Sequence, residues 1–510
     1  MTRAPSILGW LEDKSDWLSP LVVKEVRQLV RGREFMVSFG ASLAAGLAVA
    51  FFGAVDALGG SSSSGNWTFA SLMACLAFLG LAVVPLGAFS ALRTERMEQT
   101  LELITLTSLS SRRIVVGKLL AQAVKLGTLF AAMAPFVTMS FLLGGVDFVT
   151  ILIALVVLFM LSVWAGALCL LLSTAFKSRA MSFLVFGAVG VLGLFGASMG
   201  RMLFFAARGG ALGPVVFGVG IGSTTTLWWV LAIVTTFWLI SLINLVLLAE
   251  NRMSLSTEDS VTPLRIGFLV QFLVICGYTM AYVFDPPLAK SRAAEALLVL
   301  GSGHLAIVAV FVVSEDLAVP RRVLFRIRSA SPWRWLMAMF GPGGGRGAAY
   351  VLVQMVLLFG AVTLLQLTPA DRRMLLAVFG YVLFFTGIPA LAFRRLMPAR
   401  ATPLRIRAAV LVTLAVAMLV PDILYYIVQR PETLDLDFAM RHLFSPIRTI
   451  DSWDFVERAN WVGIPFAIGL TGLLAYVALI RRGVQATGKA VLIDRAAPVA
   501  GETGRGGVVY

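Results

Sequence analysis

The feature that most constrains this chain is a series of apolar runs, each about twenty residues long, which suits an α-helix crossing the ~30 Å hydrocarbon core of a membrane. These runs recur along the whole 510-residue sequence. Within hydrocarbon every backbone polar group needs a partner inside the protein, so the runs are predicted to be helical. Strands of a membrane barrel would instead alternate apolar and polar residues. The sequence therefore predicts an all-α, polytopic integral membrane protein.

Twelve runs are expected to span the membrane. They lie at approximately 35–58, 67–92, 114–143, 148–175, 180–200, 226–249, 266–284, 294–313, 349–367, 374–393, 408–428 and 460–480. A polar linker at 250–264 divides them into two six-helix membrane domains, 35–249 and 265–482. Residues 483–510 are expected to form a disordered cytoplasmic tail.

The net charge of +15 is interpreted as a topology signal. Lys and Arg are roughly threefold more frequent on one set of alternate connecting segments, the bias that marks the cytoplasmic side. Both termini are therefore predicted to lie in the cytoplasm, with the protein in a cell (inner or plasma) membrane. Because the basic residues are spread over many short segments rather than one face, nucleic-acid binding is not expected.

Segment 1–34 is predicted to contain an amphipathic interface helix. Ser19 can cap its N-terminus, and Pro20 suits the first helical position. The basic side chains share one face, opposite an apolar face at helical spacing. The basic residues are Lys24, Arg27 and Arg31. Such a helix can lie on the inner leaflet; a solvated leader that only sets topology is the alternative.

A polar segment, 93–113, separates the second and third expected spans. Thr94 can cap a short helix with Glu95 in its first turn, and apolar residues recur along it at helical spacing. Its Thr- and Ser-rich end is expected to break that helix before the third span begins. The residues alone leave open whether this is a docking surface or an elbow lying on the membrane.

The same residues resemble the permeases of the ABC-2 class of ATP-binding-cassette transporters. In that family a segment of the type E-R-x-x-G-T-L-E-L-L-x-x-T-P-L-S, followed by I-x-x-G-K, links the second and third helices. The matching residues are Glu95, Arg96, Thr100, Leu101, Glu102, Leu103, Thr107, Leu109, Ser110, Ile114, Gly117 and Lys118. Gln99 replaces the usual Gly and Ser108 the usual Pro, and these changes should stiffen the first turn or loosen the kink. The resemblance covers about residues 18–250, and "PLVVKEVRQLVRGR" is similar to the family's interface helix.

The resemblance implies that this chain is the permease subunit of an exporter. Segment 93–113 would be the coupling helix on a separate ATPase subunit, which would bind the ATP and Mg²⁺. Its coupling residues would be Glu95, Arg96, Thr100, Leu101, Glu102, Thr107, Leu109 and Ser110. The Gly-rich segment 201–225 would be re-entrant at the outer gate. A second permease chain and membrane lipids would be the other partners.

Three polar residues form a stripe on the inner end of the third span: Lys118, Gln122 and Lys125, at i, i+4 and i+7. One interpretation is that the lysines extend to the membrane surface. The other is that the stripe faces the bundle interior near Glu98 or Glu102 and joins the coupling helix to the pathway.

No catalytic, cofactor or metal site is predicted in this chain. No G-x-x-x-x-G-K-[ST] phosphate loop occurs. The Gly-rich stretch 341–347 is interpreted as a flexible loop, with an anionic-lipid contact at Arg346 as an alternative. A membrane-embedded enzyme acting on lipid-linked substrates is disfavoured because no span end gathers His, Asp or Glu. A scaffold that only anchors an ATPase is the third possibility. The second membrane domain is either accessory or a diverged repeat of the first.

Overall fold

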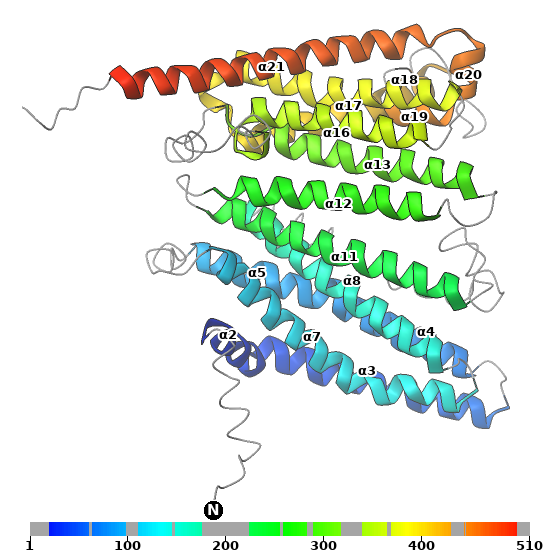
Figure 1. Cartoon of the computed structure of the whole chain (residues 1–510). Helices are drawn as coiled ribbons and strands as arrows, with labels where there is room; N and C mark the ends of the chain where they lie inside the picture. The colour runs from blue at the N-terminus through cyan, green and yellow to red at the C-terminus, as the bar shows by residue number, and fades with distance from the viewer. Residues whose placement is uncertain are drawn as a thin grey trace, which may run out of the picture. The chain divides into compact units, whose positions relative to one another are not determined.

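The computed structural model describes residues 20–60, 64–97, 111–144, 148–175, 224–254, 259–282, 289–317, 339–364, 369–429, 443 and 445–496. Every element in these ranges is a helix (Figure 1). Ten helical segments of this part are long and apolar enough to cross a membrane. The predicted all-α class is confirmed, and the chain is a polytopic helical membrane protein.

The chain divides into two compact units, Met1–Ser254 and Leu255–Tyr510. The boundary between them in the sequence falls within the expected linker 250–264. The first unit contains α2 (Pro20–Arg31), α3 (Arg33–Leu58), α4 (Ser64–Phe78), the π-helical turn η1 (Leu79–Val83), α5 (Val84–Met97), α7 (Ser111–Leu142), α8 (Phe148–Ala175) and α11 (Thr224–Met253). The second contains α12 (Val261–Tyr282), α13 (Ala289–Val313), α16 (Gly344–Leu364), α17 (Pro369–Leu396), the 3₁₀ turn η2 (Pro398–Arg400), α18 (Pro403–Gln429), α19 (Pro446–Asp451), α20 (Trp453–Arg458) and α21 (Gly463–Ala496).

Helix α7 is the centre of the first unit. It packs against α2, α3, α4, α5, α8 and α11. The apolar core of the unit includes Leu76 of α4 and Met133 of α7, both fully buried. The turn η1 ends two residues before Pro85, which has no backbone N–H to donate to a regular helical ladder. Single π-helical turns within α-helices are rare and are frequently found at functional sites.

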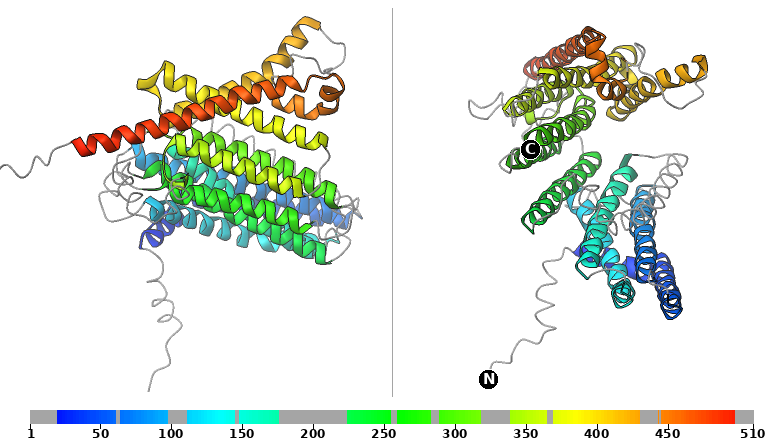
Figure 2. Two further views of the ribbon diagram at one scale, coloured as in Figure 1. Left: turned by 45° about the horizontal axis from the view of Figure 1, so that its top comes forward. Right: turned by 90° about the vertical axis from the view of Figure 1, so that its right-hand side faces the viewer.

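Helices α17 and α21 form a closely packed pair in the second unit (Figures 1 and 2). A Cβ built on Gly380 of α17 would lie only 2.8 Å from the Cα of Gly469 of α21. The two backbones therefore meet where both residues are glycine, as small residues allow between membrane helices. The core of this unit extends from these helices to α12, α13 and α16.

Within the described residues, each expected span coincides with one helix or with the series α4, η1 and α5, apart from a few residues at the ends. The expected span 180–200 and most of the segment 201–225 lie outside the described residues. The expected span 294–313 falls in α13. The described apolar part of this helix, Leu297–Val313, is shorter than the ten candidate spans. The prediction of a disordered tail from residue 483 is wrong for its first part, since α21 continues to Ala496. No proline interrupts the sequence there before Pro498.

Candidate functional site

The polar stripe of α7 is buried. Lys118, Gln122 and Lys125 are only 5%, 4% and 3% exposed, respectively. Their spacing puts them on one side of the helix, and all three face α5 through the contacts described next. We call these three residues, together with Glu25 and Glu95, the Lys118 junction.

Lys118 joins three helices through its ammonium group. Its Nζ lies 2.7 Å from Glu95 Oε1 of α5 and 3.2 Å from Glu25 Oε1 of α2. The carboxylates are partly exposed, whereas the ammonium is enclosed. Removing one partner from a buried ion pair leaves an uncompensated charge, so the ends of α2, α5 and α7 depend on this contact for their arrangement.

Gln122 contacts the backbone of α5 just after the π-helical turn. With its amide nitrogen oriented toward α5, it donates to the Val84 carbonyl at 3.1 Å, and its oxygen accepts from the Ala88 N–H at 3.1 Å. The amide therefore bridges one helical turn that contains Pro85. This contact supports α5 where its backbone ladder is irregular.

Lys125 lies deeper along α7, beside Gly87 of α5. The nearest atoms to a Cβ built on Gly87 are Lys125 Nζ at 3.7 Å and Glu34 Oε2 at 4.0 Å. Gly87 therefore leaves room for the ammonium group, and Glu34 in the first turn of α3 supplies negative charge nearby. The stripe thus connects α7 to α2, α3 and α5 with fixed charges and amide hydrogen bonds.

A further ion pair ties the beginning of α7 to the end of α11. Arg112 Nε lies 2.8 Å from Glu250 Oε2. The arginine side chain is half exposed, so this pair contributes less than the enclosed one at Lys118. It nevertheless adds α11 to the helices held at this end of α7.

The segment expected to couple to a partner is bounded by the Lys118 junction. Glu95 and Arg96 lie at the end of α5, which stops at Met97, and α7 begins at Ser111. The other expected coupling residues lie outside the described residues; they are Thr100, Leu101, Glu102, Thr107, Leu109 and Ser110. Glu98, one of the two carboxylates expected beside the stripe, also lies outside the described residues. The carboxylate of α5 that pairs with Lys118 is that of Glu95.

The expected interface helix is α2. It begins at Pro20 and ends at Arg31, before Gly32. Its basic residues Lys24, Arg27 and Arg31 are exposed, whereas Val22 is buried. Glu25, on the same helix, accepts a hydrogen bond from Lys118 Nζ.

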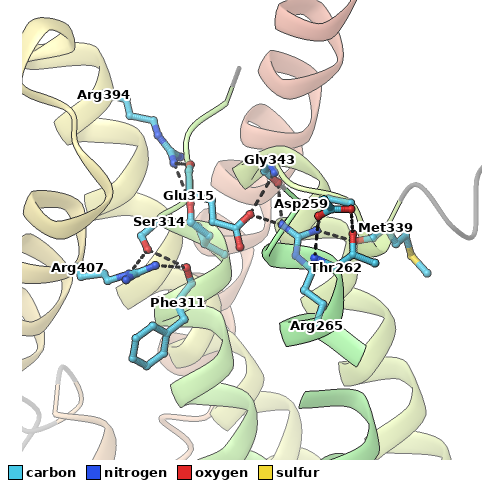
Figure 3. Close-up of polar contacts among 12 residues, drawn as sticks. Asp259, Thr262, Arg265, Phe311, Ser314, Glu315, Met339, Gly343, Arg394 and Arg407 are labelled. Carbon is cyan, nitrogen blue, oxygen red and sulfur yellow. Dashed lines mark hydrogen bonds and ion pairs between the residues drawn. The ribbon is translucent and has the colours of Figure 1, made fainter. Parts of the chain in front are cut away.

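A second polar cluster, in the second unit, was not predicted from the sequence. Arg265 of α12 is fully buried. Its Nη1 donates to the carbonyls of Met339 and Gly341 (2.6 Å to Gly341), and its Nη2 donates to Gly343 O at 3.1 Å and to Glu315 Oε2 at 2.5 Å (Figure 3). The backbone N–H of Gly343 donates to the same carboxylate oxygen at 3.1 Å.

Two more arginines reach this cluster from the opposite side (Figure 3). Arg394 of α17 donates to the carbonyls of Val313 and Glu315, at 2.9 Å for Val313. Arg407 of α18 donates to Ser314 Oγ at 2.7 Å and to the Phe311 carbonyl at 3.1 Å. Positive side chains at the C-terminal end of α13 satisfy its last carbonyls and complement its dipole. We call Arg265, Glu315, Arg394, Arg407 and residues 339–347 the arginine junction.

The stretch 341–347 is packed, so its interpretation as a flexible loop is wrong. Helix α16 begins at Gly344, where a Cβ would lie 2.9 Å from Arg394 Nη2. A Cβ on Gly345 would lie 2.9 Å from the Cα of Gly483 in α21. The glycines are needed for close approach of neighbouring chains rather than for flexibility. The one sequence feature that could have indicated the arginine junction is Arg265, an arginine at the start of an apolar run.

Asp316 adds a second carboxylate to the arginine junction. Burial raises the pKa of this carboxyl above its usual range, and the nearby Arg394 and Arg407 partly oppose that effect. Its backbone carbonyl accepts from the Gly344 N–H at 3.0 Å. Asp316 therefore lies where α13 ends and α16 begins.

Neither cluster has the composition of a catalytic centre. In the Lys118 junction one ammonium group is paired with two carboxylates, and the Gln122 amide contacts the backbone of α5. Among the residues described, no group of three or more His, Cys, Asp and Glu could hold a metal ion. Such an arrangement can fix helices and sense a change of charge or position, but it offers no activated nucleophile.

Comparison of the chain with protein-family models, with curated proteins and with solved structures found no match in any of the three.

Proposed function

We propose that this chain is the membrane-spanning permease subunit of an ATP-driven exporter of the ABC-2 type. It moves its substrate by alternating access, and a separate ATPase subunit binds ATP and Mg²⁺ and hydrolyses the nucleotide. The chain itself is not an enzyme. Both termini lie in the cytoplasm, and segment 93–113 contacts the ATPase from the cytoplasmic side of a cell membrane.

The observation that supports this proposal best is the pairing of Lys118 with Glu95 and Glu25. The motif resemblance picked out Lys118 and Glu95 at opposite ends of one segment, and it picked out the helix that carries Glu25 separately. In the structure these residues meet at one enclosed ammonium group. A transporter needs such a rigid connection between its docking segment and its central helix, because coupling travels through elements packed together.

Helix α7 connects the Lys118 junction to the other helices of the first unit. Residues 98–110 join the end of α5 to the beginning of α7, and α7 contacts six neighbouring helices. A displacement of that segment would move two helix ends held by the same ion pairs. Gln122 and Lys125 continue the polar contact with α5 along the helix. An ATPase that pushes on this segment could thus change the arrangement of α5 and α7.

The test is purification of the tagged full-length chain from the membranes of the cells that naturally produce it. We expect vanadate-sensitive ATP hydrolysis to co-purify with the wild type. Glu102→Arg should remove that activity, because it reverses a charge in the expected docking segment. The matched control is Glu432→Arg, the same change in a segment expected on the outer side, and it should retain the activity.

Reconstitution separates an exporter from a membrane scaffold. In vesicles that contain the purified complex, an exporter shows ATP-dependent movement of substrate, whereas a scaffold shows hydrolysis without movement. Absence of any ATPase from the wild-type preparation would contradict the proposal. So would full activity in a well-expressed Glu102→Arg protein.

A further inference from the structure

Helices α4 and α5 are two parts of one candidate span, Ser64–Glu95, and the π-helical turn η1 joins them. At the end of this turn the Val84 N–H donates to the carbonyl of Leu79, five residues earlier, where a regular α-helix would use the residue four earlier. Pro85 follows and has no N–H to offer the helical ladder. A π-helical turn, a proline and an inserted side chain are among the usual causes of a bend in a helix, and the first two occur here together.

The inserted side chain is the Gln122 amide of α7. It donates to the Val84 carbonyl and accepts from the Ala88 N–H, both at 3.1 Å. In a regular α-helix these two backbone groups would bond to each other, because Ala88 lies four residues after Val84. Gln122 therefore ties the first turn of α5 to α7 through groups that can bond to each other once the amide withdraws.

The two parts of this span have different neighbours. Helix α4 packs against α3 and α7, whereas the most extensive contact of α5 is with α8. The α8 contact includes the buried side chains of Phe89 and Cys169. Apolar contacts of this kind are not directional, so they permit one helix to slide over another. The contacts of α5 with α7 include two directional ones, made by Gln122 and by Glu95.

The turn η1 is itself held in place against α8. A Cβ built on Gly80 of the turn would overlap with the Ser162 hydroxyl oxygen. Ser162 is fully buried and donates to the Leu158 carbonyl at 2.8 Å. The turn is therefore a fixed point, and the irregular ladder on its C-terminal side is the place where a bend can occur.

The far end of α5 can leave α7 without leaving a buried charge alone. Lys118 Nζ contacts Glu25 Oε1 of α2 at 3.2 Å as well as Glu95 Oε1. If Glu95 moved away, the enclosed ammonium group would keep one carboxylate. The Glu95 carboxylate is partly exposed already, so water can solvate it after the movement.

We propose that η1 is a hinge about which α5 bends away from α7, and that the Gln122 amide holds the hinge in the arrangement described above. The movement belongs to this chain alone and does not depend on the proposed export function. Residues 84–94 cover about 15 Å at 1.5 Å per residue, so a bend of about 20° displaces Thr94 by about 5 Å.

Pulsed electron paramagnetic resonance measures this displacement in the full-length protein in lipid nanodiscs. Spin labels replace two exposed residues, Thr94 of α5 and Leu47 of α3, after the three cysteines have been changed to alanine. We expect one dominant distance in the wild-type background. Gln122→Leu should raise the share of a second distance, up to about 5 Å from the first, at least about tenfold, because hydrogen bonds that hold the hinge are lost.

Two controls separate a hinge from general loosening of the first unit. Labels at Leu47 and at Trp67 of α4, which lie on the same side of the hinge, should give one unchanged distance in every variant. Met133→Ala truncates a fully buried core side chain further along α7. It should lower the thermal stability without adding a second distance for Thr94.

Hydrogen exchange of the unlabelled chain, with its cysteines intact, is the second measurement. Peptides that cover η1 and the first turn of α5 should exchange at least about tenfold faster in Gln122→Leu than in the wild type. Pro85→Ala restores a backbone donor to the ladder and should slow that exchange in the Gln122→Leu background.

Equal distances and equal exchange in the wild type and Gln122→Leu would overturn the proposal. A second distance of the same share in Met133→Ala would overturn it as well, because the movement would then reflect lost stability rather than a released hinge.

Discussion

Lys118 Nζ lies 2.7 Å from Glu95 Oε1, and the two residues stand at opposite ends of the segment that leads from α5 to α7. This ion pair fixes the end of α5 to the first part of α7. The same ammonium contacts Glu25 of α2, so the helix before the first span belongs to the same connection.

Lys118→Met should destabilise the protein substantially. The substitution leaves Glu25 and Glu95 facing each other without a cation. We expect a loss of about 3 kcal/mol in the free energy of unfolding, at the lower end of the range for a broken buried pair because both carboxylates are partly exposed. Denaturant titration in detergent micelles measures it.

The matched comparison is Arg112→Gln, which removes a half-exposed ion pair at the same end of α7. It should cost less than about 1 kcal/mol. Equal losses in the two variants would show that the enclosure of Lys118 has no special effect.

The stripe and its partners illustrate what a sequence can predict. The spacing of Lys118, Gln122 and Lys125 is a property of one helix, so it was readable from the sequence. The identity of the partner was not: Glu98 or Glu102 was expected, whereas the described partner is Glu95, because the pairing depends on how α2 and the end of α5 approach α7. The start of α2 was predictable because Pro20 acts locally.

The arginine junction was hidden for a related reason. Arg265 is hydrogen bonded to residues about seventy-five positions away in sequence, and most of its acceptors are backbone carbonyls, which every residue has. Glycines near Arg346 look like a loop in the sequence, and only the positions of α13 and α21 explain why side chains are excluded there.

Close packing in the second unit predicts a strong difference between two glycines of α21. A Cβ on Gly472 would lie 2.7 Å from the backbone carbon of Leu383 and also contact the Phe384 nitrogen. Because a backbone cannot move aside cheaply, Gly472→Ala should cost about 1–3 kcal/mol.

Gly463→Ala in the same helix is the control. No atom lies within 4 Å of a Cβ built there. The change should alter the free energy of unfolding by less than about 0.5 kcal/mol. Similar denaturation curves for the two variants would contradict the close approach of α17 and α21.

Asp316 should make the second unit less stable as the pH rises. Burial raises the pKa of its carboxyl in the folded protein above the unfolded value of 3.8. The folded state therefore binds the proton more tightly, and the penalty begins as the pH rises past the unfolded pKa and is complete above the folded pKa. Relative to the wild type, Asp316→Asn should gain stability as the pH rises through that window. Thermal midpoints measured at intervals between pH 4 and 7, on the scale set by ordinary carboxyl pKa values, check this.

Glu457→Gln should show the opposite slope in the same measurements. The Arg373 guanidinium, which donates to this carboxylate at 2.9 Å, holds its pKa below the usual range, and the Trp453 indole N–H also donates to it. The stabilising contact is present above the unfolded pKa and is lost as the pH falls through the folded pKa. The wild type should therefore lose its advantage over Glu457→Gln in acid. The same slope for both variants would contradict at least one of these assignments.

The number of chains in one transport pathway is the last prediction. Each of the two units has its own core, yet the residues that match the coupling motif all lie in the first. In the corresponding part of the second unit, the described residues after α13 belong to the arginine junction, where Arg265 and Arg394 donate to backbone carbonyls. We therefore expect one ATPase contact per chain, and two permease chains, identical or not, for a pair of ATPase subunits. Native mass spectrometry of the solubilised complex counts them directly. A single permease chain with two ATPase subunits, in a complex that still transports, would mean that the second unit is a working repeat of the first.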